Sequence, residues 1–263
     1  MTDAKKFALV TGASSGIGLE LAKQFVLHDF DVVVCSEEAE ILQAADALGA
    51  SGASVTPVQA DLRSYDGVES LYSAATAAGR PIDAAALNAG IGVGGPFIET
   101  DLATELDIID LNVKSTVHLA KRLLIDMAAR NEGKLLITSS IASMTPGTFQ
   151  SIYASSKAFL QSFAEALQNE LKDTGVVITS LMPGPTDTRF FSRADMEDTR
   201  VGQGSKDDPA AVAKQGFDAL MDGELKVVAG SLKTKAMGAA DRVLPDAVKA
   251  EQHRKMAEPG GGE

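Results

Sequence analysis

Tyr153 and Lys157 stand four residues apart in the segment Tyr153-Ala-Ser-Ser-Lys157, a spacing that places two side chains on one face of a helix. The pKa of a free tyrosine is about 10, so it exchanges protons poorly at neutral pH. A neighbouring ammonium group stabilises the phenolate and lowers its pKa, which suits tyrosine to general acid–base catalysis. Taken alone, such a pair more often belongs to a solvated helix face, so its interpretation depends on the elements that position it.

A glycine-rich turn near the start of the chain predicts a phosphate-binding element. The apolar run from Phe7 to Val10 is typical of a buried strand, and it leads through Thr11-Gly-Ala-Ser-Ser-Gly-Ile-Gly18 into an apolar-periodic helix. Gly12 permits a tight turn, while Gly16 and Gly18 permit close approach of the backbone. The unpaired N–H groups of the following helix would face a pyrophosphate, although an ordinary glycine turn is the alternative.

Two later strands end in polar residues. The strand before Asn88-Ala-Gly90 ends in an amide and a glycine, and the strand Lys134–Thr138 leads to Ser140, thirteen residues before Tyr153. Ligands bind at the carboxyl ends of strands in open parallel sheets, so we expect these residues at one site.

In this order and at these spacings, the motifs resemble the classical short-chain dehydrogenase/reductase family over residues 6 to about 230. The matching positions are Thr11-Gly12-x-x-x-Gly16-x-Gly18, Asn88-Ala-Gly90, Asn112, Ser140, Tyr153-x-x-x-Lys157 and Pro183-Gly184. The resemblance implies an NAD(P)-dependent oxidoreductase that interconverts a secondary alcohol and a ketone or aldehyde by direct hydride transfer. A nucleotide-sensing binding protein, or a dehydratase or epimerase on the same fold, is the alternative.

The resemblance also implies roles for four catalytic residues. Tyr153 would be the general acid or base, and Lys157 would lower its pKa and hold the nicotinamide ribose. Ser140, rather than its neighbour Ser139, would donate a hydrogen bond to the substrate oxygen. Asn112 matches the position whose backbone holds a water that links Lys157 to solvent.

The residues implied to bind the cofactor are Gly12, Ser14, Ser15, Gly16, Ile17, Gly18, Ser36, Glu37, Asp61, Leu62, Asn88, Ala89, Gly90, Tyr153, Lys157, Pro183, Gly184, Thr186 and Thr188. Glu37 and Glu38 place negative charge beside the expected adenine ribose, and no Lys or Arg lies between Lys23 and Arg63. A carboxylate accepts hydrogen bonds from a ribose 2′-OH and repels a 2′-phosphate, so NAD is favoured. NADP stays possible, because Ser36 and Glu37 match neither usual pattern of the family.

Strand-like and helix-like segments alternate along the chain, which predicts a single Rossmann-type doubly wound α/β domain with a seven-stranded parallel sheet flanked by helices. The expected strands are Phe7–Thr11, Asp31–Cys35, Ser54–Gln59, Asp83–Asn88, Lys134–Thr138, Val176–Met182 and Lys226–Ala229. The expected helices, besides Ile17–Leu27, are Glu37–Leu48, Tyr65–Ala78, Thr104–Arg130, Ser151–Thr174 and Pro209–Asp222.

Residues 1–230 are expected to form the dinucleotide-binding domain, and 231–263 a C-terminal extension of it with a disordered tail over 258–263. Residues 189–208 are polar and glycine-containing, which favours a mobile substrate lid. The expected pocket walls, residues 93–97, 141–150, 182, 190 and 191, favour a hydrophobic carbonyl or alcohol substrate. The stretch Lys233–Met256 could be an oligomer contact, a second part of the pocket or a membrane-surface helix.

Composition excludes several classes of function. A formal net charge of −12 disfavours nucleic-acid partners. The absence of a long apolar run or signal-like segment predicts a cytoplasmic protein without membrane association. Cys35 is expected to be a buried, inert thiol, and His28, His118 and His253 stand at no metal-binding spacing. By the resemblance, we expect a homodimer or homotetramer.

Overall fold

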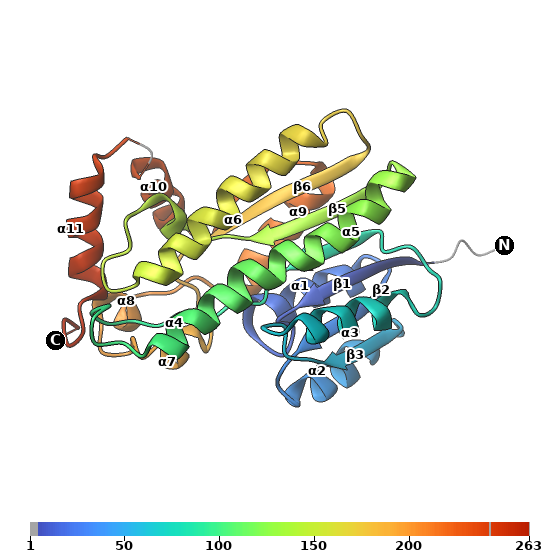
Figure 1. The fold of residues 1–263 in the computed structure, drawn as a ribbon, viewed down its shortest axis with the longest axis horizontal. Helices are drawn as coiled ribbons and strands as arrows, with labels where there is room; N and C mark the ends of the chain where they lie inside the picture. The colour runs from blue at the N-terminus through green and yellow to red at the C-terminus, as the bar shows by residue number, and fades with distance from the viewer. Residues whose placement is uncertain (1–4, 242, 263) are drawn as a thin grey trace.

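The computed structural model describes residues 5–241 and 243–262 and forms a parallel sheet with the strand order β3-β2-β1-β4-β5-β6-β7 (Figure 1). The strands are β1 Lys6–Thr11, β2 Phe30–Ser36, β3 Val55–Gln59, β4 Ala84–Leu87, β5 Gly133–Thr138, β6 Val176–Pro183 and β7 Lys226–Ala229. The predicted doubly wound, seven-stranded fold is confirmed.

Helices cover both faces of this sheet. They are α1 Gly16–Leu27, α2 Glu40–Gly49, α3 Tyr65–Thr76, α4 Leu102–Ile108, the π-helix η1 Ile109–Ser115, α5 Thr116–Arg130, the short 3₁₀ helix η2 Ile141–Met144, α6 Ser151–Glu170, α7 Phe190–Arg193, α8 Arg200–Gln203, α9 Pro209–Asp222, α10 Leu232–Ala240 and α11 Asp246–Ala257. Alternation along β1 sends Leu9 into the core under α3, α5 and α6, and Ala8 and Val10 into the core under α1, α2 and α9. Cys35 is fully buried in the first of these cores, as expected.

The helix expected over Thr104–Arg130 is continuous in space but not uniform. It begins at Leu102 as α4, widens into the π-helix η1 and continues as α5. Asn112 lies within η1 and is fully buried. Short π-helical segments inside longer helices are frequent at functional sites. Asn112, a polar residue in the middle of the predicted helix, lies in the π-helical segment η1.

Besides the short η2, four helices, α7, α8, α10 and α11, were not predicted, and in Figure 1 these four gather beyond the carboxyl ends of the strands. Each of α7 and α8 is a single turn, α10 buries only Thr234 and Gly238, and α11 is mostly polar, so none carries an apolar stripe that would reveal it.

The residues of the expected disordered tail make backbone contacts in the structure. Residues 259–262 form turns, with the amide of Gly260 donating to Asp198 Oδ2 at 2.7 Å and that of Gly262 donating to the Asp198 carbonyl at 2.9 Å. Arg200 Nε donates to the Gly261 carbonyl at 2.9 Å. These backbone contacts fix the segment although its composition is typical of disorder, and Glu263 lies outside the described residues.

Candidate active site

A pocket of about 630 Å³ opens at the carboxyl edge of the sheet. The strand order reverses between β1 and β4, and crevices at such switch points are where doubly wound sheets bind ligands. The glycine-rich turn, the ends of β4 and β5, the start of α6, the residues after β6 and helix α11 all contribute to its wall. The pocket therefore joins segments from almost the whole length of the chain.

The backbone of the glycine turn lies too close to neighbouring residues to carry larger side chains. Gly12 and Gly16 have φ angles of 66° and 55°, which L-residues rarely adopt. A Cβ at Gly12 would lie 2.9 Å from the Ala89 Cα. A Cβ at Gly18 would lie 2.1 Å from the Gly12 carbonyl oxygen, so Gly18 serves the packing of α1 against the turn rather than the pocket surface.

The N-terminus of α1 faces this turn. Its N-cap residue, Ser15, makes no side-chain cap hydrogen bond, and Ser14, Ser15, Gly16 and Ile17 line the pocket. The first N–H groups of a helix carry partial positive charge, so this end of the pocket can hold an anionic group such as a phosphate.

Ser140, Tyr153 and Lys157 lie together on the pocket wall. Tyr153 and Lys157 come from the first turns of α6, and the Lys157 ammonium lies 5.8 Å from the centroid of the Tyr153 ring. Lys157 is only 4% exposed, and its Nζ donates to the Thr138 carbonyl at 3.0 Å. The loop after β5 and the start of α6 thus bring an alcohol, a phenol and an ammonium to one surface.

Burial sets the acidity of this group in a way that the sequence did not predict. It raises the pKa of Tyr153 to about 12, against the opposing effect of a hydrogen bond with Ser140. It also lowers the pKa of Lys157 to about 8. Desolvation of the phenol therefore outweighs the lowering of the Tyr153 pKa that the sequence predicts from Lys157. Tyr153 keeps its proton at neutral pH, as an acid must.

The two neighbouring serines have different surroundings. Ser139 Oγ donates to the Lys157 carbonyl at 2.9 Å, which ties the end of β5 to α6. Ser140 Oγ accepts from the Ala142 amide at 3.1 Å and bonds with Tyr153. The contact with the phenol supports the choice of Ser140 over Ser139.

Asn112 lies behind the pocket wall. Its Oδ1 accepts from the Ile91 amide and its Nδ2 donates to the Ile91 carbonyl, both at 2.9 Å, and Nδ2 also donates to Ser156 Oγ at 3.0 Å. Ile91 itself lines the pocket. The side chain of Asn112 therefore holds the wall after β4 against α6, and a role of its backbone in proton transfer stays a prediction.

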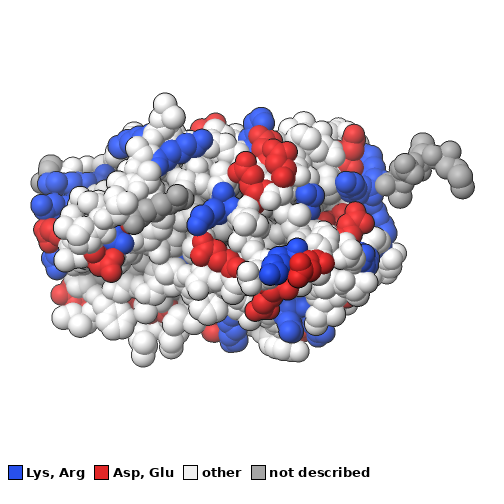
Figure 2. Space-filling model, turned by 90° about the horizontal axis from the view of Figure 1, so that it is seen from above, with Lys and Arg blue, Asp and Glu red and all other residues white. Residues whose placement is uncertain are grey.

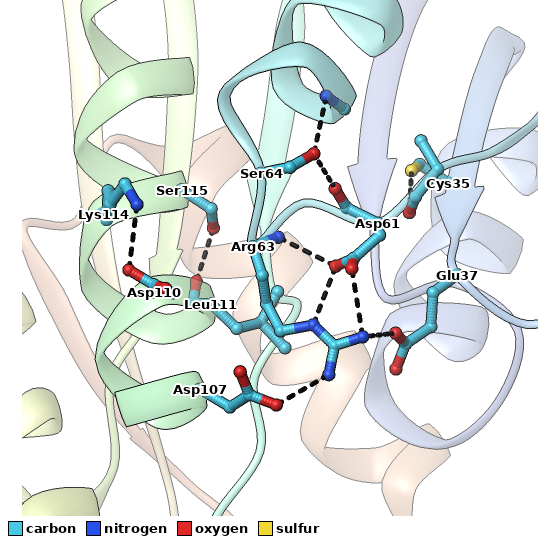
Figure 3. A network of polar contacts seen from close by, with 12 residues as sticks. Cys35, Glu37, Asp61, Arg63, Ser64, Asp107, Asp110, Leu111, Lys114 and Ser115 are labelled. Carbon is cyan, nitrogen blue, oxygen red and sulfur yellow. Dashed lines mark hydrogen bonds and ion pairs between the residues drawn. The ribbon is translucent and has the colours of Figure 1, made fainter. Parts of the chain in front are cut away.

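Glu37, the first of two acidic residues after β2, forms an ion pair with Arg63, which was not among the site residues predicted from the sequence. Arg63 Nη2 lies 2.6 Å from Glu37 Oε2, and the same guanidinium bonds to Asp61 at 2.9 Å and to Asp107 at 3.0 Å (Figure 3). The hydrogen bond from Arg63 holds the pKa of Asp61 below its usual range.

Glu38 meets two further arginines. Its Oε2 accepts from Ser14 Oγ at 2.9 Å and from Arg189 at 3.0 Å, and its Oε1 pairs with Arg193. No Lys or Arg is close to Glu38 in sequence, but Arg189 and Arg193 are close to it in space, because the fold brings the segment around α7 to the end of β2.

The predicted site residues are all within the described part of the chain, and among them only Gly18 and Asn112 lie outside the pocket lining. Of the expected substrate walls, residues 93–97 and Met182 do not line it. The sequence missed most of the wall that replaces them, which is formed by Val201, Met237, Ala240, Asp241, Lys249, Gln252, His253, Lys255 and Met256. Of the three alternatives for Lys233–Met256, the structure supports a second part of the pocket.

Within residues 5–241 and 243–262, no helix is both long and apolar enough to cross a bilayer. The same ranges contain no group of three or more His, Cys, Asp or Glu side chains that could hold a metal ion.

Comparison with known proteins gives the family. Residues 6–198 match the family model described as short chain dehydrogenase. Oxidoreductase UcpA of Salmonella typhimurium is 30% identical over 79% of this chain and 77% of its own length. Among solved structures, a short chain dehydrogenase/reductase from Burkholderia phymatum in complex with NAD superposes with a TM-score of 0.84 at 24% identity, over 98% of this chain and 99% of that one.

A short-chain dehydrogenase from Sphingobium yanoikuyae in complex with NADPH superposes with a TM-score of 0.79 at 23% identity, over 90% of this chain and 94% of that one. The two structures have the same fold as this protein. Together with the match to the family model over most of the chain, the sequence motifs and the shared fold establish that the protein belongs to the short chain dehydrogenase family.

Proposed function

We propose that this protein interconverts a secondary alcohol and a ketone or aldehyde with a nicotinamide dinucleotide as the redox partner. The observation that carries the proposal is that Ser140, Tyr153 and Lys157 line the same pocket as the glycine turn. A binding protein would need the turn but not these three groups. The names of the relatives support an oxidoreductase, and the NAD and NADPH complexes of the two similar structures support the cofactor class.

The pocket fits such a cofactor. The pyrophosphate would be held by the turn at Gly12 and Gly16 and by the first N–H groups of α1. Gly90 borders the Lys157 side chain, since a Cβ there would lie 3.3 Å from Nζ. This contact supports the proposal that Lys157 and Gly90 lie at the nicotinamide ribose. When bound, the nicotinamide supplies the two-electron redox chemistry as a hydride donor or acceptor.

The protein's own groups would handle the proton and the developing charge. In reduction, Tyr153 donates its phenolic proton to the carbonyl oxygen, and Ser140 donates a hydrogen bond to the same oxygen as negative charge builds on it. In oxidation, Tyr153 must first lose its proton, and its phenolate then takes the proton of the alcohol. The positive charge of Lys157 stabilises that phenolate, which burial alone disfavours.

We further propose that NAD(H) is preferred over NADP(H). Glu38 is the better placed of the two glutamates, because it bonds to Ser14 of the glycine turn. Ser36 Oγ completes the cluster by donating to Ser14 Oγ at 3.1 Å. A carboxylate here can accept a hydrogen bond from the ribose 2′-OH and would repel a 2′-phosphate. The opposite preference would require Arg189 and Arg193 to break their ion pairs with Glu38 and bind the phosphate themselves.

Thermal melting of the protein with NADH and with NADPH in parallel tests the cofactor, since a ligand that binds the folded state raises the melting temperature. We expect a larger shift with NADH, followed by oxidation of NADH when a panel of ketones and aldehydes is added. A larger shift with NADPH would contradict the preference and would identify the two lid arginines as phosphate ligands. No shift with either, and no turnover across the panel, would contradict the proposed function itself.

A further inference from the structure

The part of the pocket that the C-terminal helices build is polar. Six side chains there carry hydrogen-bonding or charged groups, namely Thr145, Asp241, Lys249, Gln252, His253 and Lys255. Figure 1 places α10 and α11 at the end of the molecule farthest from the N-terminus, beyond the carboxyl ends of the strands. This surface serves neither the glycine turn nor the Tyr153 group, so it is available to another part of a substrate.

Lys249 is held in place and keeps a donor for a ligand. Its side chain is 11% exposed, and its Nζ donates to the Met144 carbonyl at 2.8 Å. Its other partner is Asp246 Oδ1 at 2.7 Å, on a side chain that is 81% exposed. An ammonium has three N–H groups, so one remains after these two contacts. The ion pair with an exposed carboxylate is weak and can yield to a ligand anion.

His253 is fixed beside it. Its Nδ1 lies 2.9 Å from the Thr148 carbonyl, and a carbonyl can only accept, so Nδ1 carries the proton. Burial lowers the pKa of His253, which keeps the ring neutral. The imidazole therefore shapes this end of the pocket without adding charge, and the cationic groups of the lining here are Lys249 and Lys255.

The charge of this region runs against that of the molecule. The segment 232–257 has six Lys or Arg residues and three Asp or Glu residues, in a chain with a formal net charge of −12. Figure 2 shows Lys and Arg side chains at the end of the molecule opposite the N-terminus, with Asp and Glu side chains among them. Asp241 is the one carboxyl group in this part of the lining, it bonds with Thr145, and burial raises its pKa.

Apolar side chains line the rest of the substrate part of the pocket, among them Ile141, Phe190, Met237, Ala240 and Met256. A ligand that reaches from Tyr153 to Lys249 would therefore pass along apolar walls and end at a cation. The expectation of a hydrophobic carbonyl or alcohol substrate did not include this polar end.

We propose that the substrate is an oxo acid or hydroxy acid, whose carboxylate is bound by Lys249 while its carbonyl or hydroxyl group lies at Tyr153. This inference rests on the proposed function and names the substrate class of the same site. An apolar carbon chain separates the two polar groups of such a substrate, as the lining requires.

The test is a series of straight-chain oxo acids that carry a methyl ketone at the far end, each compared with its own methyl ester, with NADH and with NADPH. We expect the wild-type protein to favour the acid over the ester by about tenfold or more in kcat/KM at one or more chain lengths, the size of a hydrogen-bonded charge pair. Lys249→Met should reduce this acid-to-ester ratio to about one, whereas Lys235→Met, which removes an equal charge from an exposed position outside the pocket lining, should leave it unchanged.

A second measurement needs no variant. Straight-chain fatty acids have no ketone, and they should inhibit reduction competitively against the oxo acid, whereas their methyl esters should inhibit far less. Turnover of esters and neutral ketones without any preference for acids would overturn this inference and leave the proposed function standing. A failure of every ketone, acid and ester with both cofactors would instead contradict the proposed function.

Discussion

At the scale of single residues, the spacing of Tyr153 and Lys157 predicted that the two meet, and the structure adds that Lys157 is buried while Tyr153 is partly buried. Spacing along a helix fixes which side chains share a face, but the water that surrounds them depends on segments far away in the chain. Burial raises the pKa of Tyr153 and lowers that of Lys157, so desolvation outweighs the lowering of the tyrosine pKa that the sequence predicts. The buried charge of Lys157 therefore lowers the free energy of unfolding.

We predict that Lys157→Met stabilises the folded protein while abolishing turnover. Lowering the lysine pKa from 10.5 to about 8 corresponds to a penalty on the order of 3 kcal/mol at neutral pH. Loss of the hydrogen bond to the Thr138 carbonyl offsets about 1 kcal/mol of the gain. The free energy of unfolding should thus rise by about 2 kcal/mol, measured by urea titration. The exposed Lys121→Met is the matched control.

The pH dependence of that difference follows from the lowered pKa. Below about pH 8 the lysine is protonated in both the folded and the unfolded state, and the full penalty applies. As the pH rises from about 8 toward 10.5 the folded state loses the proton first, so the wild-type protein gains stability relative to the variant. Wild-type protein that is more stable than Lys157→Met at pH 7 would contradict this account of the burial.

At the scale of helices and strands, prediction succeeded where one segment carries a strong pattern of its own. The apolar run in β2 and the periodic helix over Pro209–Asp222 are examples, and α9 has the predicted bounds. Prediction failed for α11, because a polar helix at the edge of a pocket has no apolar stripe to mark it. It also failed for the arginines around Glu38, because Arg189 and Arg193 follow about 150 residues later and only the fold brings them close.

The contacts of Glu38 give a prediction for the helix α7. Its carboxylate joins Ser14 of the glycine turn to Arg189 and Arg193, which flank and end α7, so it links the expected lid to the dinucleotide part of the pocket. Glu38→Gln should weaken NADH binding about fivefold or more and weaken NADPH binding less, since it replaces a charged acceptor for the ribose by a neutral amide and removes a repulsion of the phosphate.

Titration of protein fluorescence or of cofactor fluorescence with each nucleotide would measure both dissociation constants. Glu20→Gln, which loses an ion pair with Lys23 on the surface of α1, is the control for a general loss of charge. Equal affinities of wild type and Glu38→Gln for NADH would show that the Glu38 contacts have no part in cofactor binding.

At the scale of the whole molecule, an exposed apolar surface lies on α4, η1 and α6. Leu102, Leu106 and Ile109 lie on one face of α4 and η1 and are exposed, and Phe159 on the neighbouring α6 is 45% exposed. Monomeric proteins rarely leave contiguous apolar patches of this kind in water. The family resemblance implies a homodimer or homotetramer, in which such a face would be covered.

We therefore predict a homodimer or homotetramer that forms through this face. The double variant Leu106→Asp/Phe159→Asp should lower the mass measured by light scattering after gel filtration, because it would bury two charges in the interface. Leu27→Asp changes an exposed leucine at the end of α1 and should leave the mass as it is. A wild-type protein with the mass of one chain would show that the patch has another purpose.

The central claim of the account is that Tyr153 transfers the proton in a nicotinamide-dependent redox reaction, and Tyr153→Phe tests it most directly. The variant lacks only the phenolic oxygen, so it should show a loss of kcat of about a hundredfold or more on any ketone that the wild type reduces. Its melting shift with NADH should stay close to that of the wild type. Turnover at the wild-type rate by Tyr153→Phe would contradict the account.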